Sequence, residues 1–171
     1  MKYVLFLRGI NVSGVRVPMA DLRACLTSLG LLEVKTFLQT GNVVFESDED
    51  ADVLKPTVEK VLSERFGYKA FVMLYPLSIL STVIREYPFV SNEDIHRYAI
   101  FCKDDAVIAD LLSHRDELDD SIEDIARGKH VVYWCPPKGS TLDTAFSKII
   151  AKPKYSPVTT NRTLNTLEKM I

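Results

Sequence analysis

The amino-acid sequence predicts an α+β fold in which one order of elements occurs twice and a C-terminal helix follows. Three observations predict it. Short segments rich in β-branched and aromatic residues alternate with segments whose apolar residues recur at helical spacing. Gly, Asn and Pro residues stand between these segments, where strands turn or helices end. The order strand, helix, strand, strand, helix, strand can be read in both halves, and it is the order of the ferredoxin-like (βαββαβ) fold.

The elements of the first half follow from apolar patterning and turn residues. Strands are expected at Tyr3–Arg8, Val34–Leu38, Val43–Glu46 and Ala70–Tyr75, and helices between Pro18 and Gly30 and between Asp52 and Gly67. Pro18 suits the first position of a helix, and the two glycines are typical helix ends. Nearly every residue of the first strand is apolar, so both faces of its sheet should be covered. That argues against an RNA-binding platform, which needs an open sheet face.

The second half repeats the order less regularly. A connecting helix is expected over Ser78–Glu86, strands at His96–Cys102, Ser121–Ala126 and His130–Cys135, and helices around Val107–Leu112 and over Thr141–Ile150. The last strand is less evident, and Tyr155–Thr159 could supply it before a final helix over Asn161–Met170. The sequence therefore predicts a first subdomain at 1–76, a connecting helix and loop at 77–95, and a second subdomain with the C-terminal helix at 96–171.

Composition and charge indicate an ordinary globular protein. Of the 171 residues, 47% are hydrophobic and 26% are charged, which argues against disorder. A formal net charge of −2 gives the chain as a whole no attraction for nucleic acid or anionic membrane. No stretch approaches the roughly 20 apolar residues of a membrane span, and the N-terminal apolar run is too short for a signal peptide. We expect a cytoplasmic protein without a membrane partner.

The standard catalytic and metal-binding patterns are missing from the sequence. Cys25, Cys102 and Cys135 are far apart, which argues against a disulfide framework or a zinc site. The three histidines have no metal-ligand spacing to another ligand residue. The chain contains no phosphate-binding loop, no GxSxG and no GxGxxG motif. We therefore expect no metal and no cofactor, and the pattern assigns no catalytic residue.

Polar residues gather at three expected loops. The candidate ligand-binding residues are Arg8, Asn11, Ser13 and Gly14 around the first strand-to-helix loop, Gln39 and Asn42 in the turn between the second and third strands, and Arg162 and Asn165 at the start of the last helix. A glycine-containing loop that runs into a helix can offer backbone N–H groups to an anion. Arg8 or Arg16 could add a bidentate contact.

Each of these loops also has a simpler explanation. Asn, Ser and Gly are the residues of ordinary turns, and Gly41-Asn42 is typical of a plain hairpin turn. Thr159 and Thr160 read most simply as N-caps. Arg162 would then lie in the first turn of the last helix, where a cation opposes the helix dipole. Such a position suggests a functional role.

Three segments carry a resemblance to a known family. The residues Leu7–Gly14, Pro18–Leu22 and Gln39–Phe45 resemble a bacterial family catalogued as domain of unknown function 1697. The family's C-terminal pattern, Thr-Thr-x-Arg-Asn-Trp-Asn-Thr, is similar to Thr159–Thr166, although Thr163 and Leu164 replace its Asn and Trp. The resemblance implies a cytosolic protein with tandem ferredoxin-like subdomains and no assigned activity. It also implies that one polar site unites Arg8, Asn11, Gln39, Asn42, Arg162 and Asn165.

Three functions remain open from the sequence. The first is a binding protein for a phosphate- or carboxylate-bearing ligand, which would include a nucleotide or an RNA end. The second is a structural or protein-interaction module, in which Arg8 and Arg162 satisfy carbonyl or carboxylate groups. The third is a phosphate or acyl-phosphate hydrolase, by analogy with acylphosphatases, which share the expected fold and pair an Arg with an Asn. Here Arg8 or Arg16 with Asn42 would play those parts, and the analogy is one of fold alone.

Overall fold

The computed structural model describes residues 1–11 and 14–171, and the chain forms two compact units, Met1–Ile79 with Met170 and Leu80–Lys169 with Ile171. The first unit contains β1 (Lys2–Leu7), α1 (Met19–Ser28), β2 (Leu32–Phe37), β3 (Asn42–Glu46), α2 (Ala51–Phe66) and β4 (Val72–Pro76). The helix α3 (Ser78–Arg85) connects it to the second. That unit contains β5 (Tyr98–Cys102), α4 (Asp105–Leu112), β6 (Ile125–Arg127), β7 (Val131–Trp134), α5 (Ala145–Ile150), β8 (Thr159–Thr163) and α6 (Leu164–Glu168).

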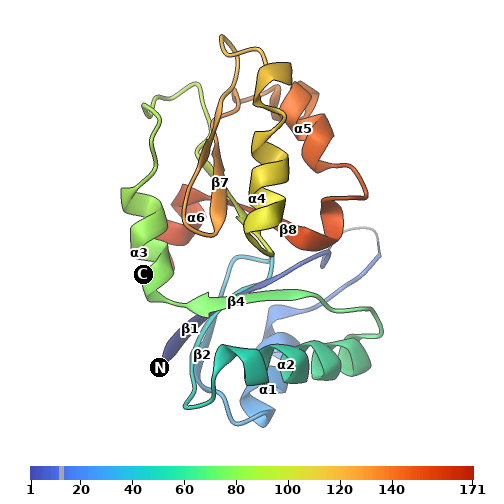
Figure 1. Ribbon diagram of the computed structural model, residues 1–171. Helices are drawn as coiled ribbons and strands as arrows, with labels where there is room; N and C mark the ends of the chain where they lie inside the picture. The colour runs from blue at the N-terminus through green and yellow to red at the C-terminus, as the bar shows by residue number, and fades with distance from the viewer. Residues whose placement is uncertain (12–13) are drawn as a thin grey trace. The chain divides into compact units, whose positions relative to one another are not determined.

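Each unit is built on a four-stranded antiparallel sheet (Figure 1). The strand order is β2-β3-β1-β4 in the first sheet and β6-β7-β5-β8 in the second. Corresponding strands therefore occupy corresponding places, and a helix follows the first and the third strand of each set. The predicted fold class is confirmed, with two tandem ferredoxin-like halves and a C-terminal helix.

The core of the first unit lies between its sheet and two helices. Leu22 and Leu26 of α1 and Leu62 of α2 pack with Leu5 of β1 and Phe45 of β3, and all five are fully buried. Burial of such aliphatic and aromatic side chains contributes roughly 1.5–3 kcal/mol each. β1 is buried along its length from its second residue onward, as its apolar sequence predicts.

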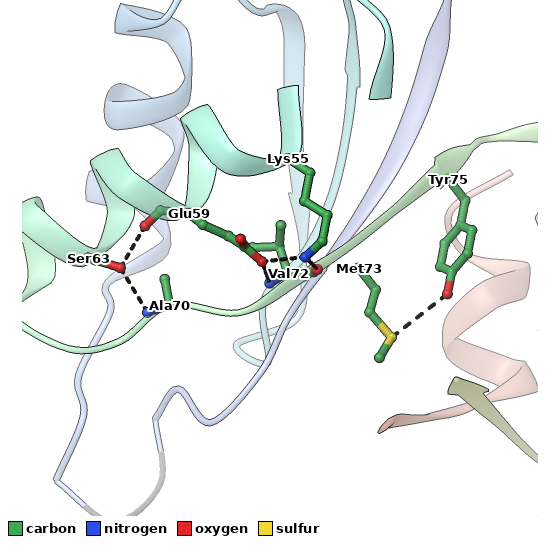
Figure 2. A network of polar contacts seen from close by, with 7 residues as sticks. All are labelled: Lys55, Glu59, Ser63, Ala70, Val72, Met73 and Tyr75. Atoms are coloured by element: carbon green, nitrogen blue, oxygen red, sulfur yellow. Dashed lines mark hydrogen bonds and ion pairs between the residues drawn. The ribbon is translucent and has the colours of Figure 1, made fainter. Parts of the chain in front are cut away.

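Side chains of α2 satisfy the outer edge of β4, the edge strand of the first sheet (Figure 2). Lys55 Nζ donates to the carbonyl oxygen of Val72 at 2.8 Å, and the Val72 N–H donates to Glu59 Oε1 at 3.1 Å. Lys55 and Glu59 also form an ion pair. Ser63 Oγ donates to the Glu59 carbonyl at 2.6 Å and accepts from the Ala70 N–H at 2.9 Å. These contacts occupy groups that an edge strand would otherwise offer to another chain.

Replacing Glu59 with Ala should destabilise the fold by about 1–2 kcal/mol, because the Val72 N–H loses its acceptor in a partly buried place. Lys60→Ala is the control, since Lys60 is the next residue of the same helix and is exposed. Urea unfolding of both variants measures the difference. Equal midpoints for the two variants would show that the carboxylate contributes nothing to the fold.

The second sheet is covered on both faces. Ile108 of α4 and Phe146 of α5 pack against Trp134 and the rest of the core on one face. On the other face the Tyr133 hydroxyl donates to the carbonyl oxygen of Val83 in α3 at 2.8 Å. In Figure 1, α3 and α4 accordingly stand on opposite sides of β7.

The end of the chain differs from the prediction. The last strand is β8, Thr159–Thr163, rather than Tyr155–Thr159, and the last helix is confined to α6 rather than extending over Asn161–Met170. A 3-10 turn at Ser156–Val158 with Pro157 precedes the strand. β8 pairs with β5 at the sheet edge, where polar residues are tolerated, and its β-branched threonines suit a strand. This strand could not be recognised from apolar alternation, because an edge strand need not be apolar.

The starts of α5 and α6 also differ from the prediction. The expected helix Thr141–Ile150 is a 3-10 turn, Thr141–Asp143, followed by α5. Thr144 separates them as the N-cap of α5, and its hydroxyl accepts from the Ser147 N–H at 3.2 Å. Thr163, and not Thr159 or Thr160, caps α6 by accepting from the Thr166 N–H. The side-chain oxygen of a Thr before a helix satisfies one of the free N–H groups there, so helices start where such a cap fits.

Candidate functional site

The side chain of Asn11 organises the loop between β1 and α1. Its backbone has a positive φ of 56°, a conformation that Asn adopts more readily than most residues. The Asn11 Oδ1 accepts from the Val17 N–H at 3.0 Å, and Nδ2 donates to the carbonyl oxygens of Gln39 at 2.6 Å and of Val17 at 3.3 Å. The structure therefore brings Asn11 and Gln39 together and ties the first loop to the turn between β2 and β3.

Gly41 and Asn42 form that turn. Gly41 has a φ of 75°, and its carbonyl oxygen accepts from the Leu7 N–H at 2.8 Å. Asn42 is fully buried, and its Nδ2 donates to the Phe37 carbonyl at 3.0 Å and to Thr40 Oγ1 at 2.8 Å. These contacts fit the simpler interpretation of Gly41-Asn42 as a hairpin turn.

A groove of about 600 Å³ opens beside the N-terminal end of α1. It is lined by Asn11, Arg16, Val17, Pro18, Met19, Ala20, Arg23 and Gln39. The lining thus contains two of the predicted site residues and two guanidinium groups, and it contains no carboxylate. The acidic residue of the first turn of α1, Asp21, is exposed and is not part of the lining.

The first turn of α1 leaves backbone donors open. Pro18 is the N-cap with extended backbone (φ −62°, ψ 136°), whereas the sequence predicted it as the first helical residue. Its side chain offers no acceptor, and its carbonyl accepts from the Leu22 N–H at 3.0 Å. The N–H groups of Met19, Ala20 and Asp21 precede that bond and have no acceptor within the helix. Two of these residues line the groove, where the helix dipole adds positive potential.

The two arginines of the groove are held differently. Arg23 Nη1 donates to Thr36 Oγ1 on β2 at 2.6 Å, which fixes its guanidinium against the sheet edge. Arg16 is exposed, and its side chain forms no hydrogen bond or ion pair with residues 1–11 or 14–171. Arg16 is therefore available to a ligand, and Arg23 is already positioned.

Arg8, Gly14 and Ser13 are the other predicted site residues of the first loop. Arg8 is half-buried, and burial lowers the pKa of its guanidinium. Its side chain has no hydrogen bond or ion pair to the described part of the chain, and it does not line the groove. Gly14 is exposed with a φ of 85°. Ser13 lies outside the described residues, so its role stays a prediction.

Arg162 and Asn165 belong to the second unit. Arg162 lies in β8 and not in a helical first turn, so the inference from an opposing helix dipole was wrong. Its Nη1 donates to Thr160 Oγ1 at 2.7 Å and to the Asn161 carbonyl at 2.8 Å. Asn165 lies in α6 and accepts from Arg97 Nη2 through its Oδ1. One polar site shared by these residues and those of the first unit stays a prediction.

Sequence reasoning missed Arg23 as a groove residue. Arg23 follows Met19 by four positions in α1, so it shares a helix face with the residue that opens the helix. That spacing could have identified it once the helix start was placed correctly. Its hydroxyl partner, Thr36, comes from β2 and has no sequence signal that links it to α1.

Burial makes the three cysteine thiols weak nucleophiles. Burial raises the pKa of the Cys25 and Cys135 thiols, and it raises the pKa of Cys102 to about 12. Thiols with raised pKa values are poor nucleophiles at neutral pH. Within residues 1–11 and 14–171, no group of three or more His, Cys, Asp and Glu residues is placed to hold a metal ion. In the same residues no helix has the length and apolar character needed to cross a membrane.

Comparison with known proteins places the chain in a family. The family model described as "Protein of unknown function (DUF1697)" matches residues 1–133. Among solved structures, the chain is similar to the conserved bacterial protein SP0830 from Streptococcus pneumoniae, with 26% sequence identity and a TM-score of 0.82. That alignment covers 99% of this chain and 96% of the other. The search of curated proteins found no match. The match over residues 1–133 shows that the chain belongs to the DUF1697 family.

Proposed function

We propose that this protein binds a small ligand that carries a phosphate or carboxylate group, and that the groove beside α1 receives that group. The observation that carries the proposal is the meeting of two guanidinium groups and an open helix N-terminus in one groove without a carboxylate in its lining. Asn11 holds this groove together by tying its loop to Gln39.

The charges and donors favour an anion. Backbone N–H groups at a helix N-terminus and the helix dipole attract negative charge. A guanidinium adds paired donors whose geometry matches a carboxylate or phosphate. Arg23 is pre-positioned by Thr36, so little side-chain entropy is lost when it binds. Arg16 is exposed and unpaired within the described residues, so its guanidinium can move onto a bound anion.

The size of the groove favours a small molecule. Its volume of about 600 Å³ lies within the roughly 300–1,000 Å³ of small-molecule sites. A nucleotide, a sugar phosphate or the end of an RNA strand would place its phosphate at α1 and leave the rest of the molecule to the remaining lining. Gln39 is exposed at the groove, where its side-chain amide can orient the polar part of such a ligand.

Replacing Arg16 with Gln should weaken binding of the anionic ligand by about tenfold or more, the effect of losing one charge-assisted hydrogen bond. The test is a thermal-shift screen of nucleotides, sugar phosphates, short RNAs and simple anions, followed by calorimetric titration of any compound that stabilises the wild type. A ligand at 100 times its dissociation constant should stabilise the fold by about 2.7 kcal/mol. Arg16→Gln without ligand should melt like the wild type, because Arg16 is exposed.

Lys60→Gln is the matched control, since it removes one positive charge from α2 in the same unit, outside the groove lining. It should bind like the wild type. If Lys60→Gln and Arg16→Gln weaken binding equally, the attraction comes from net charge and the groove is not the site. If no compound stabilises the wild type, the protein-interaction function takes precedence.

A further inference from the structure

We propose that the second unit carries its own pocket for a single oxyanion, separate from the groove beside α1. The pocket has a volume of about 140 Å³ and is lined by Ser91, Asn92, Ile95, His96, Arg97, Lys138, Thr163 and Asn165. All of these residues belong to the second unit. The inference therefore goes beyond the proposed function and does not depend on it.

Backbone hydrogen bonds join the three segments that form the pocket. The His96 N–H donates to the Pro136 carbonyl at 2.9 Å, and the Lys138 N–H donates to the Asp94 carbonyl at 2.8 Å. The Leu164 N–H donates to the carbonyl of Arg97 at 2.8 Å. The segment that enters β5, the segment that leaves β7 and the junction of β8 and α6 are thereby held in place, so the pocket is pre-formed.

Three side-chain oxygens of the pocket already accept hydrogen bonds from the protein. Arg97 Nη2 donates to Asn165 Oδ1 and, at 3.0 Å, to Glu168 Oε1. Asn92 Oδ1 accepts from the Asp94 N–H at 2.8 Å. Thr163 Oγ1 accepts from the backbone of α6 as its N-cap. No carboxylate lines the pocket, and Glu168 outside it is already paired with Arg97.

The donors of the pocket remain available. Because Asn165 presents its oxygen to Arg97, its NH₂ group is left without a bond to the described residues. The same holds for the amide NH₂ of Asn92. Lys138 Nζ has no hydrogen bond or ion pair within residues 1–11 and 14–171, and only Nη2 of the Arg97 guanidinium is used there. The Ser91 hydroxyl and the His96 ring can each donate or accept. The open donors therefore favour a group that only accepts, which is an oxyanion.

The charge and the volume of the pocket limit the kind of ligand that it can bind. Glu168 offsets the charge of Arg97, whereas the Lys138 ammonium group has no ion pair within residues 1–11 and 14–171. A volume of about 140 Å³ is smaller than the roughly 300 Å³ at which sites for drug-sized molecules begin. It suits one phosphate or sulfate group. Such a group is either free inorganic phosphate or the end of a phosphate monoester, and the two share the chemistry that the pocket recognises.

The test is an NMR titration of the ¹⁵N-labelled full-length protein with inorganic phosphate at constant ionic strength. The backbone amide chemical shifts are measured at each phosphate concentration. We expect saturable shifts at residues 91–97, 138 and 163–165. Lys138→Gln should weaken phosphate binding by about tenfold, and Lys138→Arg should retain the wild-type affinity. Lys148→Gln, which removes an exposed charge of α5 in the same unit, is the matched control and should bind like the wild type. A parallel titration with glycerol phosphate distinguishes free phosphate from a phosphate monoester, because the compound that the pocket recognises should bind more tightly.

Asn165→Asp keeps the test independent of folding. The new carboxylate still accepts from Arg97, so the unit should remain folded, but its negative charge should abolish phosphate binding. Shifts that never saturate, or that saturate equally in wild type, Lys138→Gln and Asn165→Asp, would overturn the proposal. Saturable shifts confined to residues 14–23 and 39 would overturn it while supporting the groove of the first unit. Saturable shifts at the pocket without any at the groove would support the pocket and count against the groove of the first unit as a phosphate site.

Discussion

Replacing Gly41 with Ala is expected to destabilise the protein by about 3–5 kcal/mol, as overpacking and backbone strain act together. A Cβ atom at Gly41 would lie 2.6 Å from the Cβ of Leu7 and 2.8 Å from the Cδ1 of Ile10. The Leu7 Cβ is fixed to the backbone of β1, and both neighbours are buried, so neither can move aside cheaply. The φ of +75° adds strain for any residue with a side chain.

Urea unfolding measures this loss, and Gly67→Ala is the matched control. Gly67 ends α2 with a φ of +68°, and a Cβ there would meet nothing within 4 Å. The control should therefore lose only the conformational term, about 1 kcal/mol. If both variants lose the same amount, backbone strain alone explains Gly41. If the groove binds an anion as proposed, the Gly41 variant should also bind it more weakly, because the turn carries the Gln39 carbonyl that holds Asn11.

Replacing Glu123 with Ala is expected to cost about 3–5 kcal/mol of stability, because two buried donors are left without an acceptor, at roughly 1–3 kcal/mol each. Glu123 is 3% exposed. Its Oε2 accepts from Trp134 Nε1 at 2.8 Å, and its Oε1 accepts from the Phe146 N–H at 3.0 Å. One side chain thus joins the loop before β6 to β7 and to the start of α5.

The chain provides a control for this variant in Asp120, an exposed acidic residue of the same loop. Asp120→Ala should unfold within about 0.5 kcal/mol of the wild type. Glu123→Gln should be intermediate, since the amide oxygen can serve one donor while the NH₂ group faces the other. Urea titration followed by Trp134 fluorescence reports directly on this site. A Glu123→Ala variant as stable as Asp120→Ala would mean that the two donors find other acceptors.

The first unit was predictable because its local signals agree with its tertiary structure. Apolar residues at helical spacing became the buried faces of α1 and α2, and the apolar β1 became the buried centre of the sheet. Gly41-Asn42 indicated the turn, and the turn forms there. Where propensity, patterning and turn chemistry point the same way, the element can be read without its neighbours.

β8 could not be predicted in the same way. Its sequence, Thr-Thr-Asn-Arg-Thr, carries no apolar alternation, and it became a strand because β5 offers a free edge for it. The register that places Arg162 opposite Ala99 is a property of the pairing and not of the segment. This is why Arg162 was assigned to a helix, and why Thr159 and Thr160 were interpreted as caps.

The sequence by itself determined the family, the α+β class and the repeated element order, and it indicated the two loops that contain Asn11, Gln39 and Asn42. Only the tertiary structure decided what those residues do: the amide of Asn11 bonds to Gln39, 28 residues away, and the amide of Asn42 bonds within its own turn. It likewise brought Arg23 to the start of α1, and it brought Lys138 and Asn165 to one pocket. Patterns along the chain record burial and turns, whereas a site depends on which donors remain open after the segments have paired.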